Sequence, residues 1–155
     1  MEWTETDSTR CSVARTAAIV SDAWTVVVLR DLFNGVRRFD DLVRHLGIAR
    51  NVLTRRLAVL TETGIVRKVP YREPGHRERH EYRLTPAGRE LLPVLLAMLA
   101  WGDTHLAGPD GPPMLVEHEG CGAPVRLEMR CAEGHLIEPG TRLRTVPGPG
   151  ARRTG

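Results

Sequence analysis

Residues 50–60 hold the side chains of this chain that are best suited to specific chemistry. At 3.6 residues per turn, four polar side chains share one side of a helix: Arg50, Asn51, Thr54 and Arg55. The opposite side is apolar through Leu53, Leu57 and Leu60, at i, i+4 and i+7 spacing. A guanidinium can pair with a guanine edge, an amide with an adenine edge, and either can bind a phosphate. The segment therefore predicts a helix that enters the major groove of DNA.

A second predicted helix precedes this one, so that residues 39–64 contain two short amphipathic helices joined by a turn at Gly47. This arrangement is a helix-turn-helix, in which the first helix holds the second clear of the protein surface. The alternative is an ordinary helical hairpin with solvated arginines, because such patterns also arise by chance.

Two strands are predicted after the arginine-bearing helix. Residues 64–69 form a β-branched strand, and residues 81–84 are its expected antiparallel partner. The connection turns at Pro74-Gly75 and carries cations that Glu73 and Glu78 only partly offset. These cations are Arg72, Arg77 and Arg79. A hairpin with a basic tip at this place is a wing, which contacts phosphates or the minor groove.

With this wing, residues 11–103 resemble the HxlR-type family of winged-helix transcriptional regulators, relatives of the MarR group. Spaced short motifs carry the resemblance: Cys11 with Arg15, Asp22-Ala23-Trp24-Thr25, Leu29-Arg30-Asp31-Leu32, Gly35, Arg38-Phe39, Leu53-Thr54-Arg55-Arg56-Leu57, Gly64-Ile65-Val66, Glu81-Tyr82-Arg83-Leu84-Thr85, Gly88-Arg89, Leu92-Pro93-Val94-Leu95 and Trp101-Gly102. The resemblance implies a dimeric regulator that acts at a promoter. We include Arg38, directly before the first helix, among the expected DNA-binding residues.

The sequence departs from the usual family pattern at two positions. Ala49 stands where a Ser or Thr often caps the recognition helix, and losing that cap costs about 1 kcal/mol of helix stability. Asn51 stands where a Lys is common, which alters the base or phosphate that can be contacted. The operator of a relative is therefore not transferable to this chain.

Length and charge agree with one small domain. The chain has 155 residues and a formal net charge of +3, and we expect the excess to matter through its placement between Arg37 and Arg79. No stretch has the apolar length of a membrane span, and the first residues lack the layout of a secretion signal. We expect a cytoplasmic protein whose three cysteines serve thiol, metal or core roles.

Three further helices are expected around the helix-turn-helix. Residues 12–20 and 23–32 form two, and the second is so apolar that burial on most sides is expected. Pro86, after the capping residue Thr85, begins another that continues through the apolar residues 91–101, with Pro93 near enough to its start to bend it. This last run carries more apolar surface than a small domain can cover. A subunit interface is the expected use of the excess, with a helix folded onto its own core as the alternative.

Two kinds of signal are possible for such a regulator. Trp24, Met98 and Trp101 lie on helices expected to meet across the dimer, where an apolar cavity would bind a small apolar or aromatic effector. The alternative is that both tryptophans fill the core. Cys11 is a second candidate, because relatives use a cysteine at the matching position as a redox or electrophile sensor.

The composition changes after residue 107. We expect a flexible start (1–10), a winged-helix and dimerisation domain (11–107), a Cys/His-containing appendage (108–144) and a disordered tail (145–155). In the appendage, His118, Cys121, Cys131 and His135 could hold one structural zinc. The Cys-x-x-Cys repeat of a zinc ribbon is not present, and packed cysteines, surface histidines or a Cys121–Cys131 redox pair are the alternatives.

Enzyme chemistry finds no support in the sequence, which has no Gly-rich phosphate motif, His-Glu-x-x-His or Gly-x-Ser-x-Gly. A metal-site enzyme or sensor and a protein-binding winged helix are the rival functions. The expected fold is mainly α with a small β-hairpin wing (α+β), a winged helix-turn-helix that dimerises through its N-terminal and C-terminal helices and carries a knuckle-like appendage. The expected function is a homodimeric regulator, by preference a repressor, that reads a pseudo-palindromic operator and responds to a small molecule.

Overall fold

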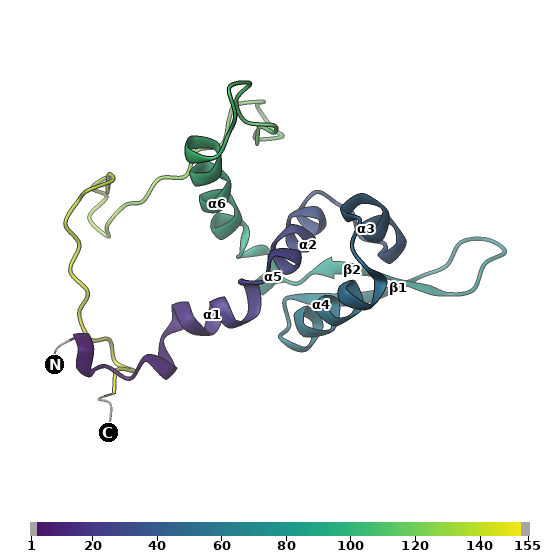
Figure 1. Cartoon of the computed structure of the whole chain (residues 1–155), viewed down its shortest axis with the longest axis horizontal. Coiled ribbons are helices and arrows are strands. Elements are labelled where there is room, and N and C mark those ends of the chain that lie inside the picture. The colour runs from purple at the N-terminus through teal and green to yellow at the C-terminus, as the bar shows by residue number, and fades with distance from the viewer. Residues whose placement is uncertain (1–2, 153–155) are drawn as a thin grey trace. The chain divides into compact units, whose positions relative to one another are not determined.

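The computed structural model of this chain describes residues 3–152 (Figure 1). It divides the chain into two compact units, one formed by residues up to 92 with the segment from 147, the other by residues 93–146. The outermost positions of the predicted flexible start and tail, residues 1–2 and 153–155, lie outside the described residues.

The first unit is mainly helical and contains a two-stranded hairpin. Short 3-10 helices at Trp3–Glu5 and Ser8–Arg10 precede four α-helices: α1 (Ser12–Val20), α2 (Ala23–Phe33), α3 (Phe39–Leu46) and α4 (Arg50–Glu62). The antiparallel strands β1 (Val66–Tyr71) and β2 (Arg79–Leu84) follow, then the short α5 (Pro86–Arg89). Figure 1 shows the hairpin projecting beyond α3 and α4. The predicted fold class, mainly α with a β-hairpin wing, is confirmed.

The core of this unit is formed by α2, α3, α4 and the start of β1. Its buried apolar residues are Val28, Leu29, Leu32, Leu42, Ile48, Leu53, Leu57, Leu60, Ile65 and Val66. Because every third or fourth residue of α4 belongs to this set, the rotation of α4 about its axis is fixed by burial.

Helix α2 is buried or half-buried on most of its sides. Asp22 caps it by accepting a hydrogen bond from the Thr25 N–H at 3.1 Å, and Thr25, Val28 and Leu29 are buried. Trp24, however, remains 38% exposed. The other residues of α2 except Ala23 are buried or half-buried, as expected from its composition. Within residues 3–152 no single helix is long and apolar enough to span a membrane, and α1 and α2, which would suffice together, are bent by 82°.

A buried carboxylate joins α2 to α3. The Asp31 side chain is 2% exposed, and it accepts two hydrogen bonds from the Arg30 guanidinium, at 3.0 and 2.8 Å. Its other oxygen lies 2.6 Å from His45 Nδ1. Burying a carboxylate is unfavourable unless its oxygens are hydrogen-bonded, so these contacts hold the end of α3 at a defined place on α2.

The chain leaves the hairpin through a tight packing contact. Thr85 caps α5, as predicted, by accepting a hydrogen bond from the Gly88 N–H at 3.0 Å, and its own N–H donates to the Ile65 carbonyl. Gly88 is buried so close to that carbonyl that an added Cβ would lie 2.1 Å from the oxygen. The next helix, α6 (Leu92–His105), is separate from α5, because Pro93 has no N–H to donate to the Arg89 carbonyl and continue α5.

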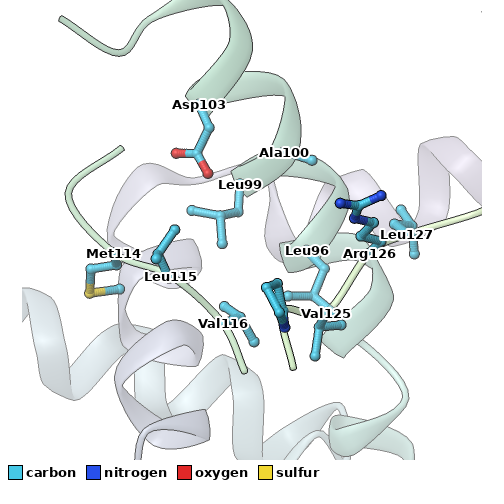
Figure 2. A pocket seen from close by; sticks show the side chains of 11 residues that line it. Leu96, Leu99, Ala100, Asp103, Met114, Leu115, Val116, Val125, Arg126 and Leu127 are labelled. Carbon is cyan, nitrogen blue, oxygen red and sulfur yellow. The ribbon is translucent and has the colours of Figure 1, made fainter. Parts of the chain in front are cut away.

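In the second unit, α6 is followed by a segment that folds back as a short ribbon. The Val125 N–H donates to the Val116 carbonyl at 2.8 Å, and the His118 N–H donates to the Ala123 carbonyl at 2.9 Å. Figure 2 shows Leu96 and Leu99 of α6 facing the ribbon across a hollow of about 370 Å³. One face of α6 is thus directed at the chain's own appendage.

We predict opposite effects of the same substitution at two glycines. Gly88→Ala lowers the stability of the first unit by at least about 1–3 kcal/mol, because the new methyl group meets a backbone oxygen that cannot rotate away. Gly102→Ala in α6 meets open space and raises helix stability by about 0.5–1 kcal/mol. Urea unfolding followed by circular dichroism measures both. Equal stability of Gly88→Ala and the wild type would contradict the packing described here.

Candidate nucleic-acid interface

Helices α3 and α4 are joined by a turn whose geometry the sequence dictates. Gly47 ends α3 with a left-handed backbone (φ +62°), which a residue with a Cβ rarely adopts, and its N–H donates to the Val43 carbonyl. Ile48 is buried directly after it and anchors the turn in the core. Ala49 occupies the N-cap of α4 and makes no side-chain capping bond, as its methyl group requires. The predicted helix-turn-helix is therefore present.

The outward face of α4 carries the predicted polar set. Leu53, Leu57 and Leu60 are at most 1% exposed, which turns the opposite face to solvent. That face consists of Arg50, Asn51, Thr54 and Arg55, all exposed. The Thr54 hydroxyl donates to the Arg50 carbonyl at 2.8 Å, and the Asn51 side-chain oxygen accepts from the Val52 N–H at 2.9 Å. Arg55 makes no hydrogen bond or ion pair within the described part of the chain.

Arg50 is held in place by α3. Its guanidinium donates to Asp40 Oδ1 at 2.8 Å and lies 4.8 Å from the centre of the Phe39 ring. Both partners come from the first turn of α3, so the pairing fixes the start of α4 against the start of α3. This contact was not predicted from the sequence, although Asp40 and Arg50 both belong to the predicted helix-turn-helix.

Arg38 links the helix-turn-helix to the wing. Its guanidinium lies 2.7 Å from a Glu73 carboxylate oxygen and 4.6 Å from the centre of the Tyr71 ring. The Glu73 carboxylate raises the pKa of Arg38 above its ordinary value, so this arginine stays charged. In addition, the Tyr82 N–H donates to the Arg37 carbonyl at 2.8 Å, which places residues 37–38 beside β2.

A hollow of about 410 Å³ lies between the start of α3, the start of α4 and the wing. We call it the recognition hollow; its lining residues are Arg38, Phe39, Asp40, Asp41, Arg50, Tyr71, Arg79, His80 and Tyr82. Three of the predicted DNA-binding arginines therefore border one concave surface. Arg72 and Arg77 are exposed in the wing loop, outside this hollow. The predicted set thus lies on α4, on the wing and, for Arg38, at the N-cap of α3, all in the first unit.

The candidate signal residues are distributed over both units. Cys11 is half-buried at the N-cap position of α1, without a side-chain capping bond. Trp24 lies on α2 in the first unit, whereas Met98 and Trp101 lie on α6 in the second and are 51% and 58% exposed. A common pocket for these three side chains stays a prediction.

The His/Cys residues of the appendage form two pairs. His118 Nδ1 lies 3.3 Å from Cys121 Sγ, and His135 Nδ1 lies 3.5 Å from Cys131 Sγ. Each pair spans a tight turn, closed by the Gly122 N–H on the His118 carbonyl and the Cys131 N–H on the His135 carbonyl. Within residues 3–152 no three His, Cys, Asp or Glu side chains gather closely enough to hold one metal ion.

Comparison with known proteins assigns this architecture to a family. The model of HxlR-like helix-turn-helix proteins matches residues 19–109. An HTH-type transcriptional regulator of Mycobacterium tuberculosis is 42% identical over 90% of this chain and 85% of its own length. The crystal structure of PA1607, a candidate transcription factor, is 36% identical with a TM-score of 0.76, covering 87% of this chain and 94% of its own.

A third similarity is to the reduced form of the redox regulator HypR. It is 28% identical with a TM-score of 0.53, covering 59% of this chain and 90% of its own. These relatives are regulators of transcription rather than enzymes. The chain, with its helix-turn-helix and its wing, belongs to the HxlR-like helix-turn-helix family of transcriptional regulators.

Proposed function

We propose that this protein is a homodimeric repressor that reads a pseudo-palindromic operator in the cytoplasm and is released by a small-molecule effector. The observation that carries the proposal is the outward face of α4, where Arg55 has no partner within residues 3–152 and Arg50 is held by Asp40. An unpaired guanidinium on such a face is available for a guanine edge in the major groove. Wing arginines beyond it supply phosphate contacts.

The proposed dimer rests on α6. Most residues of α6 are apolar, yet none of them is buried. Val94, Met98 and Trp101 recur at i, i+4 and i+7 and form an exposed apolar stripe, whereas Leu96 and Leu99 face the ribbon (Figure 2). A second copy of the chain covers such a stripe by two-fold symmetry, which also presents two α4 helices to two half-sites.

The effector of the proposed repressor is a small molecule with an apolar or aromatic body, for which Trp24, Met98 and Trp101 are the candidate contacts. Cys11 is the alternative sensor. Its support is the half-buried thiol at the start of α1 together with the similarity to HypR, which is a redox regulator. In either case the signal must bind or modify one dimer geometry in preference to the other.

A structural zinc is proposed for the appendage. With Zn–S distances of about 2.3 Å and Zn–N distances of about 2.0–2.1 Å, tetrahedral ligands lie about 3.6 Å apart. The observed distances between His Nδ1 and Cys Sγ, 3.3 and 3.5 Å, are close to this ligand–ligand distance. Each turn therefore offers two of the four ligands of a zinc site. The two turns must meet, within one chain or across the dimer, to complete it.

The outward face of α4 and the wing loop predict different DNA-binding defects. On a duplex selected by the wild-type protein from random sequence, Arg55→Ala weakens binding by about 1–3 kcal/mol and has a much smaller effect on unrelated DNA. Arg77→Ala weakens binding to both duplexes and lowers the salt dependence by about one ion. Fluorescence anisotropy at several salt concentrations measures both effects.

Arg142→Ala is the matched control, because it removes the same charge from an exposed position in the appendage. We expect it to leave the affinities for both duplexes unchanged. Wild-type affinity of Arg55→Ala and Arg77→Ala on the selected duplex would show that the DNA-binding face is elsewhere.

A charge in the exposed stripe of α6 separates the subunits. Met98→Glu gives a monomer in light scattering and lowers operator affinity at least tenfold, because a monomer engages only one half-site. Leu143→Glu alters an even more exposed apolar side chain outside α6, and this variant remains dimeric. A dimeric Met98→Glu protein with intact operator affinity would contradict the proposed interface.

Zinc content is measured directly by mass spectrometry of the purified protein. We expect one zinc ion per chain, its loss in Cys121→Ser, and its retention in Cys11→Ser, which removes a thiol outside the appendage. A wild-type protein that binds no zinc after incubation with the metal would exclude a metal role for these four residues.

A further inference from the structure

A second hollow lies at the root of the wing, with a volume of about 410 Å³. Four arginines line it, one each from the α2–α3 connection, β1, β2 and α5: Arg37, Arg67, Arg83 and Arg89. Its apolar lining comes from Leu32, Phe33, Leu84 and Leu92. No acidic residue is part of this lining. We call it the arginine cavity.

The strand register places two of these cations opposite each other. Arg67 of β1 is the direct cross-strand partner of Arg83 of β2, so both side chains leave the same face of the hairpin. Like charges at opposed positions destabilise a strand pair. The DNA-binding role of α4 does not require this pair, since neither arginine belongs to the helix or to the wing loop.

The cluster is only partly neutralised by the protein. Glu81, on the same strand, pairs with Arg83, and Arg89 donates a hydrogen bond to the Leu84 carbonyl at 3.1 Å. The side chains of Arg37 and Arg67 have neither a hydrogen bond nor an ion pair anywhere in residues 3–152. Four guanidinium groups therefore face one carboxylate, which leaves an excess of positive charge around an apolar floor.

The arginine cavity and the recognition hollow have no lining residue in common. Successive side chains of a strand point to opposite faces, so Arg83 and its neighbour Tyr82 lie on different sides of the hairpin root. Tyr82 lines the recognition hollow, together with Arg50. A duplex held by α4 would meet that side, so DNA phosphates do not explain the arginine cavity.

We infer that the arginine cavity binds a small organic anion, a carboxylate or sulfonate attached to an aromatic or aliphatic body. A guanidinium pairs with such an oxyanion through two parallel hydrogen bonds. Arg67 and Arg83, which lie opposite each other, can each form such a pair with a bound anion. The apolar floor accommodates the body, and the volume is in the range of small-molecule sites. An inorganic anion would satisfy the cations alone and leave the accessible parts of Phe33, Leu84 and Leu92 uncovered.

The site also suggests what the ligand does, which rests on the proposed function. The cavity joins the end of α2, both wing strands and the first residue of α6. A bound anion thus ties the two wing strands to the end of α2 within the first unit. The anion changes the affinity of the protein for its operator only if it binds the DNA-free and the DNA-bound conformations of the protein with different affinities.

Binding is tested on the full-length dimer without DNA, with benzoate as the probe, by saturation-transfer NMR and calorimetry. Inorganic phosphate supplies charge without an apolar body, and benzyl alcohol supplies the body without charge. We expect benzoate to bind at least tenfold more tightly than either. Arg67→Gln and Arg83→Gln reduce benzoate affinity at least tenfold, whereas Arg72→Gln, a matched change in the wing loop, leaves it unchanged.

Thermal unfolding distinguishes a loss of benzoate binding from a loss of folding. Because Arg67→Gln removes one member of a like-charged pair and no hydrogen bond or ion pair, its melting temperature without ligand equals or exceeds that of the wild type, so binding that this variant loses is not lost folding. Benzoate affinity that matches phosphate or benzyl alcohol, or that survives Arg67→Gln, would overturn the site. Since no DNA is present, a failure here leaves the proposed operator binding standing, and a failed operator assay leaves benzoate binding standing.

Discussion

Burial of one face of α4 is the constraint on which the rest of the structure depends. Leu53, Leu57 and Leu60 are enclosed by the core, so the helix cannot rotate about its axis without exposing them. This fixes Arg55 outward. It also fixes the wing, because β1 begins four residues after α4 ends and packs through the buried Val66. An apolar contact thereby determines where the polar chemistry of this protein is presented.

Charge in this chain acts through pairing rather than through its total, which is only +3. Where a carboxylate is close, the cation holds structure: Asp40 fixes Arg50, and Glu73 ties Arg38 to the wing. Where no carboxylate is close, the cation is left for an external anion. Arg55 on the outward face of α4 is a cation of this second kind, as are Arg37 and Arg67 in the arginine cavity.

The sequence predicted those parts of the fold that local patterns determine. The span of α1, the Thr85 cap and the two faces of α4 follow from periodicity and residue type, and the structure agrees. Contacts distant in sequence were not predictable: the Asp31–His45 contact needs the packing of α2 on α3, and the opposition of Arg67 and Arg83 needs the strand register. The exposure of Trp24 was misjudged because an apolar composition does not reveal which faces meet the core. The His/Cys pattern was recognised, but only the structure shows that it forms two separate pairs.

The central claim is that two copies of α4 read successive major grooves on one side of the duplex. Methylation interference at guanine N7 tests it most directly, because N7 lies in the major groove. On the selected operator, the account predicts interference in two symmetric patches whose centres are about 10–10.5 base pairs, or one helical turn, apart, since two recognition helices related by a two-fold axis meet the same face of the DNA. Interference at a single patch, or binding that is indifferent to N7 methylation throughout the site, would contradict it.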